Sequence, residues 1–465
     1  MVKKKDDSRL AGLREPIGIL GVGVEGRATI DYLLREGICD ITALDRREIG
    51  DLPAGVKSVF GADHDQDLEK FATIFRSPGI RPDHPSLTAA RSAGCLVTSA
   101  VSHFLEQCPA LTIGVTGTVG KGTAASLVAR MLEQDGRTVH LGGNIGSSPL
   151  EFLRDVNPEH VVVLEISSFQ AMDVTSSPGI GVILKTTSEH LDWHVDLDEY
   201  LDAKANLLAA QGTKDTVVYN ADASPSVRIA DSGSTRRLAY SLTSEVEEGI
   251  YCNGGRFILR LDGRESTLPL DLDQVRLPGF FNLENVAAAI LAAHAAGGST
   301  EAICLAGVQF EGLPHRLELA AEAGAIRFYN DSYATRPEAA LGALSCFDDV
   351  PLAIILGGSE KYADFSVLAK ALVEHPKIVE IGLIGETAGR LKRAIDKAGQ
   401  YRFDVIEYED LEPAMDGAVR ALSGSGVVLL APACASFGLF PNYKVRGERF
   451  RAKAALLARE LNSSG

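Results

Sequence analysis

Short apolar runs alternate with amphipathic segments along almost the whole chain of 465 residues. The apolar runs include residues 17–20, 111–115, 161–165, 181–184, 352–356, 378–384 and 427–431. Helix-like stretches such as 123–134 and 282–296 lie between them. This alternation predicts an α/β protein built from parallel sheets with helices on both faces. Ligands of such sheets bind beyond the carboxyl ends of the strands, so the loops that follow strands are where function is expected.

Two breaks in the pattern, together with the chain length, predict three domains. A usual domain has about 150 residues. One break lies at Cys108 and Pro109, just before a strand-like run, and the other lies at Gly312, where a turn precedes a new alternating block. We therefore expect domains at residues 1–108, 109–312 and 313–465. Within the middle domain, the segment 215–277 has short strand-like runs broken by Gly and Ser, which is typical of a meander.

Composition excludes several classes of function. The net charge of −16 argues against a nucleic-acid binder or a polybasic membrane protein. Seven scattered cysteines without a CxxC pair indicate reduced thiols rather than disulfides or a zinc site. The N-terminus lacks the apolar segment of a secretory signal, and no apolar run reaches the roughly 18–20 residues of a membrane span. We expect a cytoplasmic enzyme that binds neither nucleic acid nor membrane.

A first glycine-rich motif, with Gly21, Gly23 and Gly26, lies between the run 17–20 and a helical stretch at 27–35. Glycines in this setting let the backbone approach a pyrophosphate at a helix N-terminus. Asp45 ends the next strand-like run, where an acid commonly binds a ribose. The motif alone is compatible with a dinucleotide, with another nucleotide, or with a tight strand–helix turn that binds nothing.

A second loop follows the run 111–115 and consists of Gly117, Thr118, Val119, Gly120, Lys121, Gly122 and Thr123. Backbone N–H groups of such a loop cradle phosphates, and its lysine neutralises the β/γ charge. Because Gly122 follows Lys121 directly, the hydroxyl that binds magnesium must come from Thr123. Two phosphate loops about a hundred residues apart predict two nucleotides, which disfavours a simple dehydrogenase.

Acidic and basic residues of the same central block complete a possible phosphate site. Glu165 ends the run 161–165, His190 follows another strand-like run, and Lys204 lies fourteen residues beyond His190. A carboxylate and an imidazole at strand ends can hold magnesium beside phosphates. Taken singly, Glu165 and His190 are also compatible with solvated polar side chains, and Lys204 with a surface lysine on a helix.

The order of these motifs resembles that of the Mur ligase family over nearly the whole chain. The matching segments are Gly-Thr-Val-Gly-Lys at 117–121, Gly-Asn-Ile-Gly at 143–146, Glu-Ile-Ser-Ser-Phe-Gln at 165–170, Glu-His-Leu-Asp at 189–192, Gly-Leu-Pro-His-Arg at 312–316, Asn-Asp-Ser at 330–332 and Ala-Pro-Ala-Cys-Ala-Ser at 431–436. The resemblance implies a Rossmann-like N-terminal domain that binds UDP. It also implies a P-loop ATPase-like central domain and a Rossmann-like C-terminal domain that brings the amino acid.

The resemblance further implies an ATP-dependent ligase that adds D-glutamate to UDP-N-acetylmuramoyl-L-alanine through an acyl phosphate, in peptidoglycan precursor synthesis. Because a carboxylate is a poor electrophile and two anions must meet, ATP and two Mg²⁺ ions are expected. The partners would be these small molecules, and we expect a monomer. The catalytic residues implied are Lys121, His190 and Lys204. The metal ligands implied are Thr123, Glu165, His190 and Lys204, the last as a carbamate.

Three binding groups follow from the same resemblance. The UDP-substrate group is Gly21, Gly23, Val24, Gly26, Asp45, Arg46, Ser77, Pro78, Gly79, Asn144, Ser167 and Gln170. The ATP group adds Asn282, Arg316 and Asp331 to the loop from Gly117 to Thr123. The glutamate group is Thr335, Arg336, Lys361, Ser436, Phe437 and Tyr443.

The chain departs from the family pattern at Val119, at Gly122 and in the loop from Tyr333 to Pro337. That loop resembles a branch of the family that adds L-glutamate, so the stereochemistry stays open. We hypothesise that Arg336 replaces a cation missing from the loop. Three other functions are weighed: a folylpolyglutamate-type ligase, which lacks an N-terminal UDP domain; an NAD-dependent oxidoreductase, in which the second loop has no role; and an inactive nucleotide-binding homologue.

Overall fold

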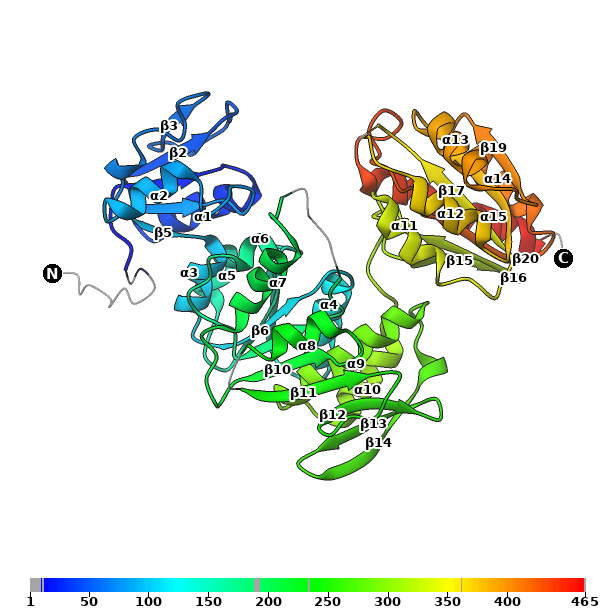
Figure 1. Cartoon of the computed structure of the whole chain (residues 1–465), viewed down its shortest axis with the longest axis horizontal. Helices are drawn as coiled ribbons and strands as arrows, with labels where there is room; N and C mark the ends of the chain where they lie inside the picture. The colour runs from blue at the N-terminus through cyan, green and yellow to red at the C-terminus, as the bar shows by residue number, and fades with distance from the viewer. Residues whose placement is uncertain (1–9, 11, 188–192, 233–234, 361, 464–465) are drawn as a thin grey trace. The chain divides into compact units, whose positions relative to one another are not determined.

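The computed structural model describes residues 10, 12–187, 193–232, 235–360 and 362–463 (Figure 1). The chain forms two compact units, one of residues 1–274 with 283–308 and one of residues 275–282 with 309–465. The first unit contains two sheets and the second unit contains one. Parallel pairs predominate in all three sheets, so the α/β architecture expected from the sequence is confirmed.

The first sheet has five parallel strands in the order β3-β2-β1-β4-β5. They are β1 (Ile17–Leu20), β2 (Ile41–Asp45), β3 (Lys57–Phe60), β4 (Thr73–Arg76) and β5 (Leu96–Thr98). Helices α1 (Val24–Arg35), α2 (Pro85–Ser92) and α3 (Ala100–Gln107) connect or follow them. Because strand order reverses beside β1, the loops after β1, β2 and β4 meet at one edge, where such sheets bind ligands. Helix α1 begins at Val24, so the predicted start at residue 27 is wrong.

The second sheet has nine strands in the order β14-β13-β12-β11-β10-β9-β6-β8-β7. They are β6 (Leu111–Thr116), β7 (Val139–Gly143), β8 (Val161–Glu165), β9 (Ile180–Ile183), β10 (Thr216–Asn220), β11 (Arg236–Ser241), β12 (Gly249–Asn253), β13 (Arg256–Leu261) and β14 (Arg264–Asp271). Strands β10, β11 and β12 pair in parallel, so the predicted meander is wrong there. Helix α8 (Ser224–Ala230) provides the crossover that the parallel pair β10–β11 requires. Strand β13 pairs antiparallel with both of its neighbours, β12 and β14.

Helices of the second sheet position the second glycine-rich loop and the residues around it. They are α4 (Lys121–Gln134), α5 (Pro149–Phe152), α6 (Ser168–Ala171), α7 (Leu197–Ala205), α9 (Phe280–Ala295) and α10 (Thr300–Gln309). Strand β8 is an unbroken buried run, as expected of a strand covered on both faces. One apolar cluster includes Ile30 and Phe104 from the first sheet's helices together with Leu150 and Leu164 from the second sheet's elements. The two sheets of this unit therefore share a core.

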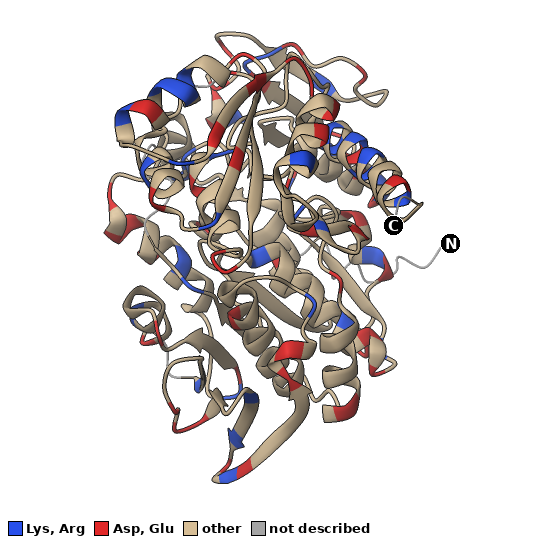
Figure 2. Ribbon diagram, turned by 90° about the vertical axis from the view of Figure 1, so that its right-hand side faces the viewer, with Lys and Arg blue, Asp and Glu red and all other residues tan. Residues whose placement is uncertain are grey.

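The second unit is built around a six-stranded sheet in the order β15-β16-β20-β17-β18-β19. Its strands are β15 (Glu318–Ala323), β16 (Ala325–Asn330), β17 (Leu352–Gly357), β18 (Ile378–Ile384), β19 (Asp404–Tyr408) and β20 (Ser425–Leu430). Strands β15 and β16 pair antiparallel, and the other neighbouring strands of this sheet pair in parallel. The helices are α11 (Pro337–Leu344), α12 (Ser366–Glu374), α13 (Ala388–Ala398), α14 (Leu411–Ala421) and α15 (Tyr443–Ser463). Basic residues recur along α15 near the C-terminus (Figure 2).

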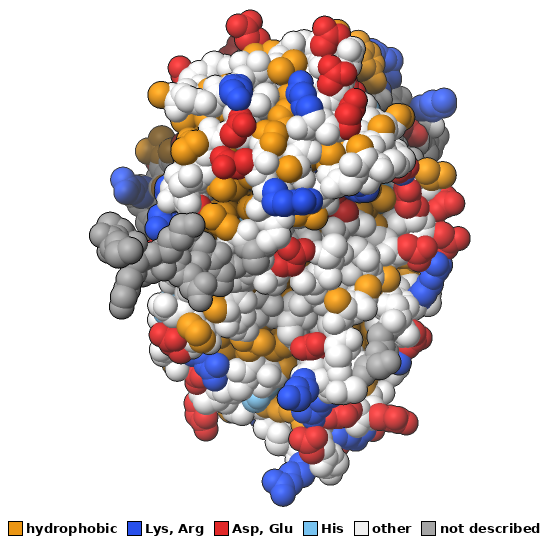
Figure 3. Space-filling view, turned by 90° about the vertical axis from the view of Figure 1, so that its left-hand side faces the viewer, with side chains coloured by type: hydrophobic (Ala, Val, Ile, Leu, Met, Phe, Trp, Pro, Cys, Tyr) orange, Lys and Arg blue, Asp and Glu red, His pale blue; other side chains and the backbone are white. Residues whose placement is uncertain are grey.

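Surface and helix properties complete the description of the fold. On the face shown in Figure 3, the acidic and the basic side chains that are drawn in colour are interspersed with one another. Within the described ranges, no helix combines the length and the apolar content that crossing a bilayer would require.

Candidate active site

A cavity of about 750 Å³ opens at the carboxyl edge of the first sheet. This volume is typical of a small-molecule site. Six residues predicted to bind the UDP-substrate line it: Gly21, Gly23, Asp45, Arg46, Ser77 and Gly79. Val24 is 79% exposed beside Gly23, and Gly26 is buried in the first turn of α1. The structure therefore brings most of the residues predicted on this sheet to one cavity.

Asp45 shapes the wall of this cavity through the backbone. Its Oδ2 accepts a hydrogen bond from Val22 N at 2.8 Å, and its Oδ1 accepts one from Arg47 N at 2.9 Å. Burial opposes ionisation of Asp45, but these two backbone hydrogen bonds, together with the charges of Arg47 and His64, lower the pKa of the carboxyl. The carboxylate thus holds the first glycine loop and the end of β2 together.

Ser167 and Gln170, from α6 and its N-cap, connect to the first glycine loop. The side chain of Gln170 donates from Nε2 to Glu25 Oε1 at 2.5 Å. Gln170 Oε1 in turn accepts hydrogen bonds from Ser167 N at 2.9 Å and from Ser167 Oγ at 3.0 Å. Burial raises the pKa of Glu25, which carries the only acidic side chain within residues 21–26. Two predicted substrate residues of the second sheet are therefore tied to the loop of the first.

The second glycine-rich loop closes on itself through its lysine. Lys121 begins α4, and its Nζ donates to the carbonyl oxygens of Gly117 at 3.1 Å and Thr118 at 2.8 Å. Gly120 has φ +89°, and a Cβ there would lie 2.1 Å from Asn285 Oδ1. Only glycine fits that conformation without strain. The loop has the compact backbone path that a phosphate cradle needs.

Lys204 lies beneath this loop and is 1% exposed, which excludes the surface-lysine interpretation. From α7 its Nζ donates to Gly117 O at 2.8 Å and to Thr116 Oγ1 at 3.4 Å. The ammonium also lies 4.6 Å from the centre of the Tyr200 ring. A fully buried lysine is rare unless its charge has partners or its chemistry is used.

Glu165 supplies an acceptor that its surroundings leave open. The side chain is 2% exposed at the end of β8, and its Oε1 accepts from Asn144 Nδ2 at 3.0 Å. Its Oε2 is buried and has no hydrogen-bond partner among the residues that the structure describes. A buried carboxylate oxygen in this state is costly unless a ligand or a cation completes it.

These residues fit one magnesium ion. Magnesium is usually held by one or two carboxylates together with waters and substrate phosphates. Glu165 at the end of β8 can supply the carboxylate, and Thr123 in the first turn of α4 can supply a hydroxyl. Within the described parts of the chain, no three His, Cys, Asp or Glu side chains form a metal cluster. His190 lies outside the described residues, so a second ion stays a prediction.

In the second unit, three residues predicted to bind ATP or glutamate lie near the carboxyl end of β16. Asp331 Oδ1 accepts from Leu317 N at 3.2 Å, and burial raises the pKa of Asp331 to about 7. The Arg316 guanidinium lies 3.9 Å from the centre of the Tyr333 ring, which packs edge-on against Tyr443 at 5.1 Å. Arg316, Asp331 and Tyr443 thus belong to one cluster.

The other predicted residues of the second unit lie at starts and ends of elements. Asn282 is in the first turn of α9 and donates to Pro278 O at 2.7 Å. Thr335 and Arg336 directly precede α11, with Arg336 at its N-cap. Ser436 is buried and Phe437 is 58% exposed in the segment after β20. Lys361 lies outside the described residues.

Comparison with known proteins identifies the family. Residues 15–99 match the Mur ligase MurD-like N-terminal domain, residues 115–293 the Mur ligase middle domain, and residues 315–434 the Mur ligase glutamate ligase domain. The UDP-N-acetylmuramoylalanine–D-glutamate ligase of Symbiobacterium thermophilum is 35% identical over 457 residues, which are 96% of this chain and 99% of that protein. The enzyme of the same name from Clostridium novyi is 32% identical over 446 residues, 94% and 95% of the two chains. The chain belongs to the Mur ligase family.

Members of the Mur ligase family are ATP-dependent ligases that form amide bonds, and they use Mg²⁺. The MurF ligase of Thermotoga maritima, solved in complex with ADP, is a structural relative with a TM-score of 0.58 and 18% identity. The match covers 97% of this chain and 95% of that one, and it shows the shared fold.

Sequence analysis of this Mur ligase missed part of the wall of the first cavity. Four basic residues also line it: Arg47, His64, Arg81 and His84. Arg81 bonds Glu199 Oε1 at 2.6 Å and Trp193 O at 2.8 Å, and its hydrogen bond lowers the pKa of Glu199 to about 2. Their positions in the sequence could have revealed these four residues, because each follows β2, β3 or β4 at the ligand-binding edge of the sheet.

Proposed function

We propose that this chain joins D-glutamate to UDP-N-acetylmuramoyl-L-alanine at the expense of ATP, in peptidoglycan precursor synthesis. One observation carries the proposal: a single unit holds both a cavity for a nucleotide-sized ligand and a phosphate loop that packs against buried Lys204. Buried Glu165 lies on the strand beside that loop. The names and identities of the Symbiobacterium and Clostridium relatives support D-glutamate as the amino acid.

The proposed reaction needs charge neutralisation at the second loop. ATP would phosphorylate the terminal carboxylate of the UDP-substrate, the amine of glutamate would attack the acyl phosphate, and phosphate would leave through a tetrahedral intermediate. Lys121 Nζ would exchange its carbonyl partners at Gly117 and Thr118 for phosphate oxygens. Fixed positive charge at this point lowers the barrier most when water is excluded.

Magnesium would supply further positive charge next to the transferred phosphoryl group. We propose Glu165 and Thr123 as the residues that hold one ion, and His190 with a carbamylated Lys204 as those that hold a second. Burial of Lys204 supports the carbamate, because carbamylation would convert a buried cation into an anionic ligand. Asn144 would keep Glu165 oriented through its 3.0 Å hydrogen bond.

The three-domain division at 1–108, 109–312 and 313–465 belongs to the same proposal, as do a monomeric state and a cytoplasmic location. The C-terminal domain would bring Arg316 and Asp331 to ATP, which Asn282 of the central domain would also contact. The same C-terminal domain would bring Thr335, Arg336, Lys361, Ser436, Phe437 and Tyr443 to glutamate. Closure of this domain over the phosphates is the expected motion.

Release of ADP and phosphate tests the proposal. The protein is incubated with ATP, Mg²⁺ and UDP-N-acetylmuramoyl-L-alanine, in parallel with D-glutamate, with L-glutamate and without an amino acid. Release that depends on D-glutamate is expected. Release with L-glutamate alone would transfer the chain to the L-specific branch and make the loop from Tyr333 to Pro337 the selector. Nucleotide binding without release under any condition would favour an inactive homologue.

A further inference from the structure

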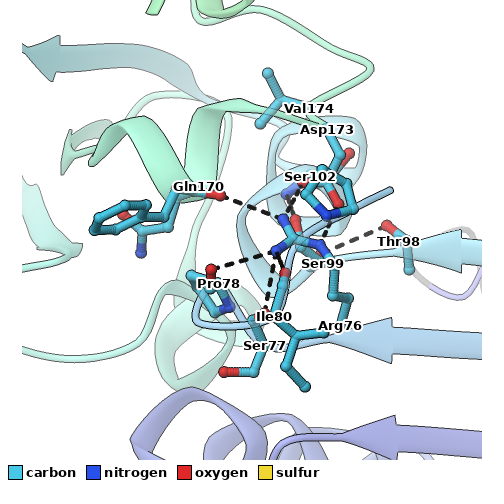
Figure 4. A network of polar contacts seen from close by, with 12 residues as sticks. Arg76, Ser77, Pro78, Ile80, Thr98, Ser99, Ser102, Gln170, Asp173 and Val174 are labelled. Atoms are coloured by element: carbon cyan, nitrogen blue, oxygen red, sulfur yellow. Dashed lines mark hydrogen bonds and ion pairs between the residues drawn. The ribbon is translucent and has the colours of Figure 1, made fainter. Parts of the chain in front are cut away.

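Arg76 ends β4 and is one of the largest fully buried side chains of the molecule. It directly precedes Ser77, Pro78 and Gly79, the segment predicted to bind the UDP-substrate. Figure 4 shows its guanidinium between that segment and the region of α6, with Asp173 on the α6 side. No role was assigned to Arg76 by its sequence pattern or by the resemblance.

One half of the guanidinium contacts α6 and the residues after it. Arg76 Nε donates to Asp173 Oδ2 at 2.7 Å, and Nη2 donates to Asp173 Oδ1 at 2.7 Å. The same Nη2 donates to Phe169 O at 3.3 Å. Asp173 is itself only 11% exposed, so this bidentate pair is almost free of solvent. Removing one partner of such a pair leaves a buried charge uncompensated.

The other half of the guanidinium holds the loop after β4. Arg76 Nη1 donates to Ile80 O at 2.5 Å, to Ser77 O at 3.1 Å and to Pro78 O at 3.4 Å. These hydrogen bonds turn the three carbonyl groups toward Arg76, which is not among the residues that line the larger cavity with Ser77, Gly79 and Ile80. An anionic ligand in that cavity is therefore spared their repulsion. Lysine cannot copy this arrangement, since it has one nitrogen and no planar fork.

A second contact reaches the first glycine loop from the same helix. Gln170 of α6 donates to Glu25 at 2.5 Å, and a small cavity is lined jointly by Gly21, Glu25, Arg76 and Ser77. Helix α6 and the residue segment after it thus fix both loops that border the larger cavity. The loop 21–26 is held through Gln170, and the loop 77–80 is held through Arg76 and Asp173.

We propose that Arg76 and Asp173 are positioning residues for the UDP-bearing substrate, holding the 77–80 loop with its carbonyl groups turned from the diphosphate. This inference rests on the proposed function. It predicts a selective effect: affinity for the UDP-substrate depends on the pair, whereas affinity for ATP does not.

The test compares Arg76→Lys and Asp173→Asn with the unaltered protein. Binding of UDP-N-acetylmuramoyl-L-alanine and of ATP is measured separately by calorimetry, KM and kcat are measured for each substrate, and Tm is measured by circular dichroism. We expect Kd and KM for the UDP-substrate to rise about 10- to 100-fold, the range for losing hydrogen bonds to a charged group. The constants for ATP should change less than about twofold. If Arg76→Lys does not fold, Asp173→Asn decides, because it keeps the size of the side chain and leaves the loop carbonyls their donor.

Arg154 offers a matched control. It too joins the two sheets of this unit, with its Nε 3.0 Å from Glu36 Oε1, but it does not line either cavity. Arg154→Lys should leave binding of both ligands unchanged. Folded variants that bind the UDP-substrate as tightly as the unaltered protein would overturn the inference, and so would equal losses for UDP-substrate and ATP with a lowered Tm. Failure of the unaltered protein to bind the UDP-substrate would instead overturn the proposed function.

Discussion

The two glycine-rich loops share a backbone plan and differ in charge. Each follows a buried parallel strand, β1 or β6, and each leads into a helix, α1 or α4. The first loop carries Glu25 and is held by Asp45, which binds Val22 N. The second loop carries Lys121 and has Lys204 buried beneath it.

This difference indicates two kinds of phosphate site. A diphosphate that stays intact needs room for close backbone approach, which the cavity beside Gly21 and Gly23 provides. A phosphate that is transferred accumulates charge in the transition state and needs fixed cations. Under the proposed function, the same strand–loop–helix unit would serve binding in one place and chemistry in the other, according to which side chains it carries.

The largest effect is expected at the lysine of the second loop. Lys121→Ala should lower kcat by about 10²- to 10³-fold, because a preorganised cation at the transferred phosphate is lost. Steady-state ADP release measures the effect. Lys57→Ala is the control: Lys57, the first residue of β3, is 68% exposed and pairs with Asp40, and its replacement should leave kcat unchanged. An Lys121→Ala protein with near-normal kcat would remove the distinction between the loops.

Glu165→Gln should raise the Mg²⁺ concentration for half-maximal activity by about 10- to 100-fold. The amide keeps an oxygen for Asn144 but replaces Oε2, which has no partner among the described residues, with a donor. A magnesium titration of ADP release measures this shift, and exposed Glu159→Gln is the control. An unchanged magnesium dependence would show that Glu165 does not hold the ion.

A matched pair of glycine substitutions probes the two backbones directly. Gly120→Ala should lower the free energy of unfolding by about 2–4 kcal/mol, because φ is +89° and the new Cβ would meet Asn285. Gly23→Ala meets no atom within 4 Å and should cost less than about 1 kcal/mol. Its methyl group would enter the cavity and raise KM for the UDP-substrate about tenfold. Urea unfolding and KM measurements separate the outcomes; equal losses of stability would contradict the comparison.

The sequence predicts the parallel sheets well because buried parallel strands are continuous apolar runs. The runs 17–20, 161–165 and 378–384 coincide with β1, β8 and β18. The segment around β10 to β12 is predicted poorly, since strand direction there depends on whether α8 crosses the sheet. A seven-residue helix that begins with Ser-Pro gives too little periodicity to reveal the crossover.

For the candidate site, the motif residues could be predicted from the sequence, but the buried contacts that hold them in place could not. Gly21, Asp45 and Ser77 meet at one cavity because topology places the ends of β1, β2 and β4 together. Burial of Lys204 depends on how α7 packs beneath a loop more than 80 residues earlier, as its 88-residue separation from Thr116 illustrates. The contact between Arg76 and Asp173 spans 97 residues and has no local pattern.

The acid of the first loop gives the smallest expected effect and the sharpest pH signature. Burial raises the pKa of Glu25, although the hydrogen bond from Gln170 and the charge of Arg76 lower it in part. A carboxyl group whose pKa is raised by folding contributes stability below its unfolded pKa and loses that contribution as the pH rises through its folded pKa. Glu25→Gln should therefore raise Tm at pH 8, by at most about 2 °C, and leave it unchanged near pH 4. Asp31→Asn, an exposed change on the same helix, should show no such pH dependence.

Because the glutamine of Glu25→Gln removes a negative charge beside the proposed diphosphate site, KM for the UDP-substrate should fall rather than rise. The first loop would then tolerate loss of its charge where the second does not, and a rise in KM would instead mean that ionised Glu25 itself assists binding.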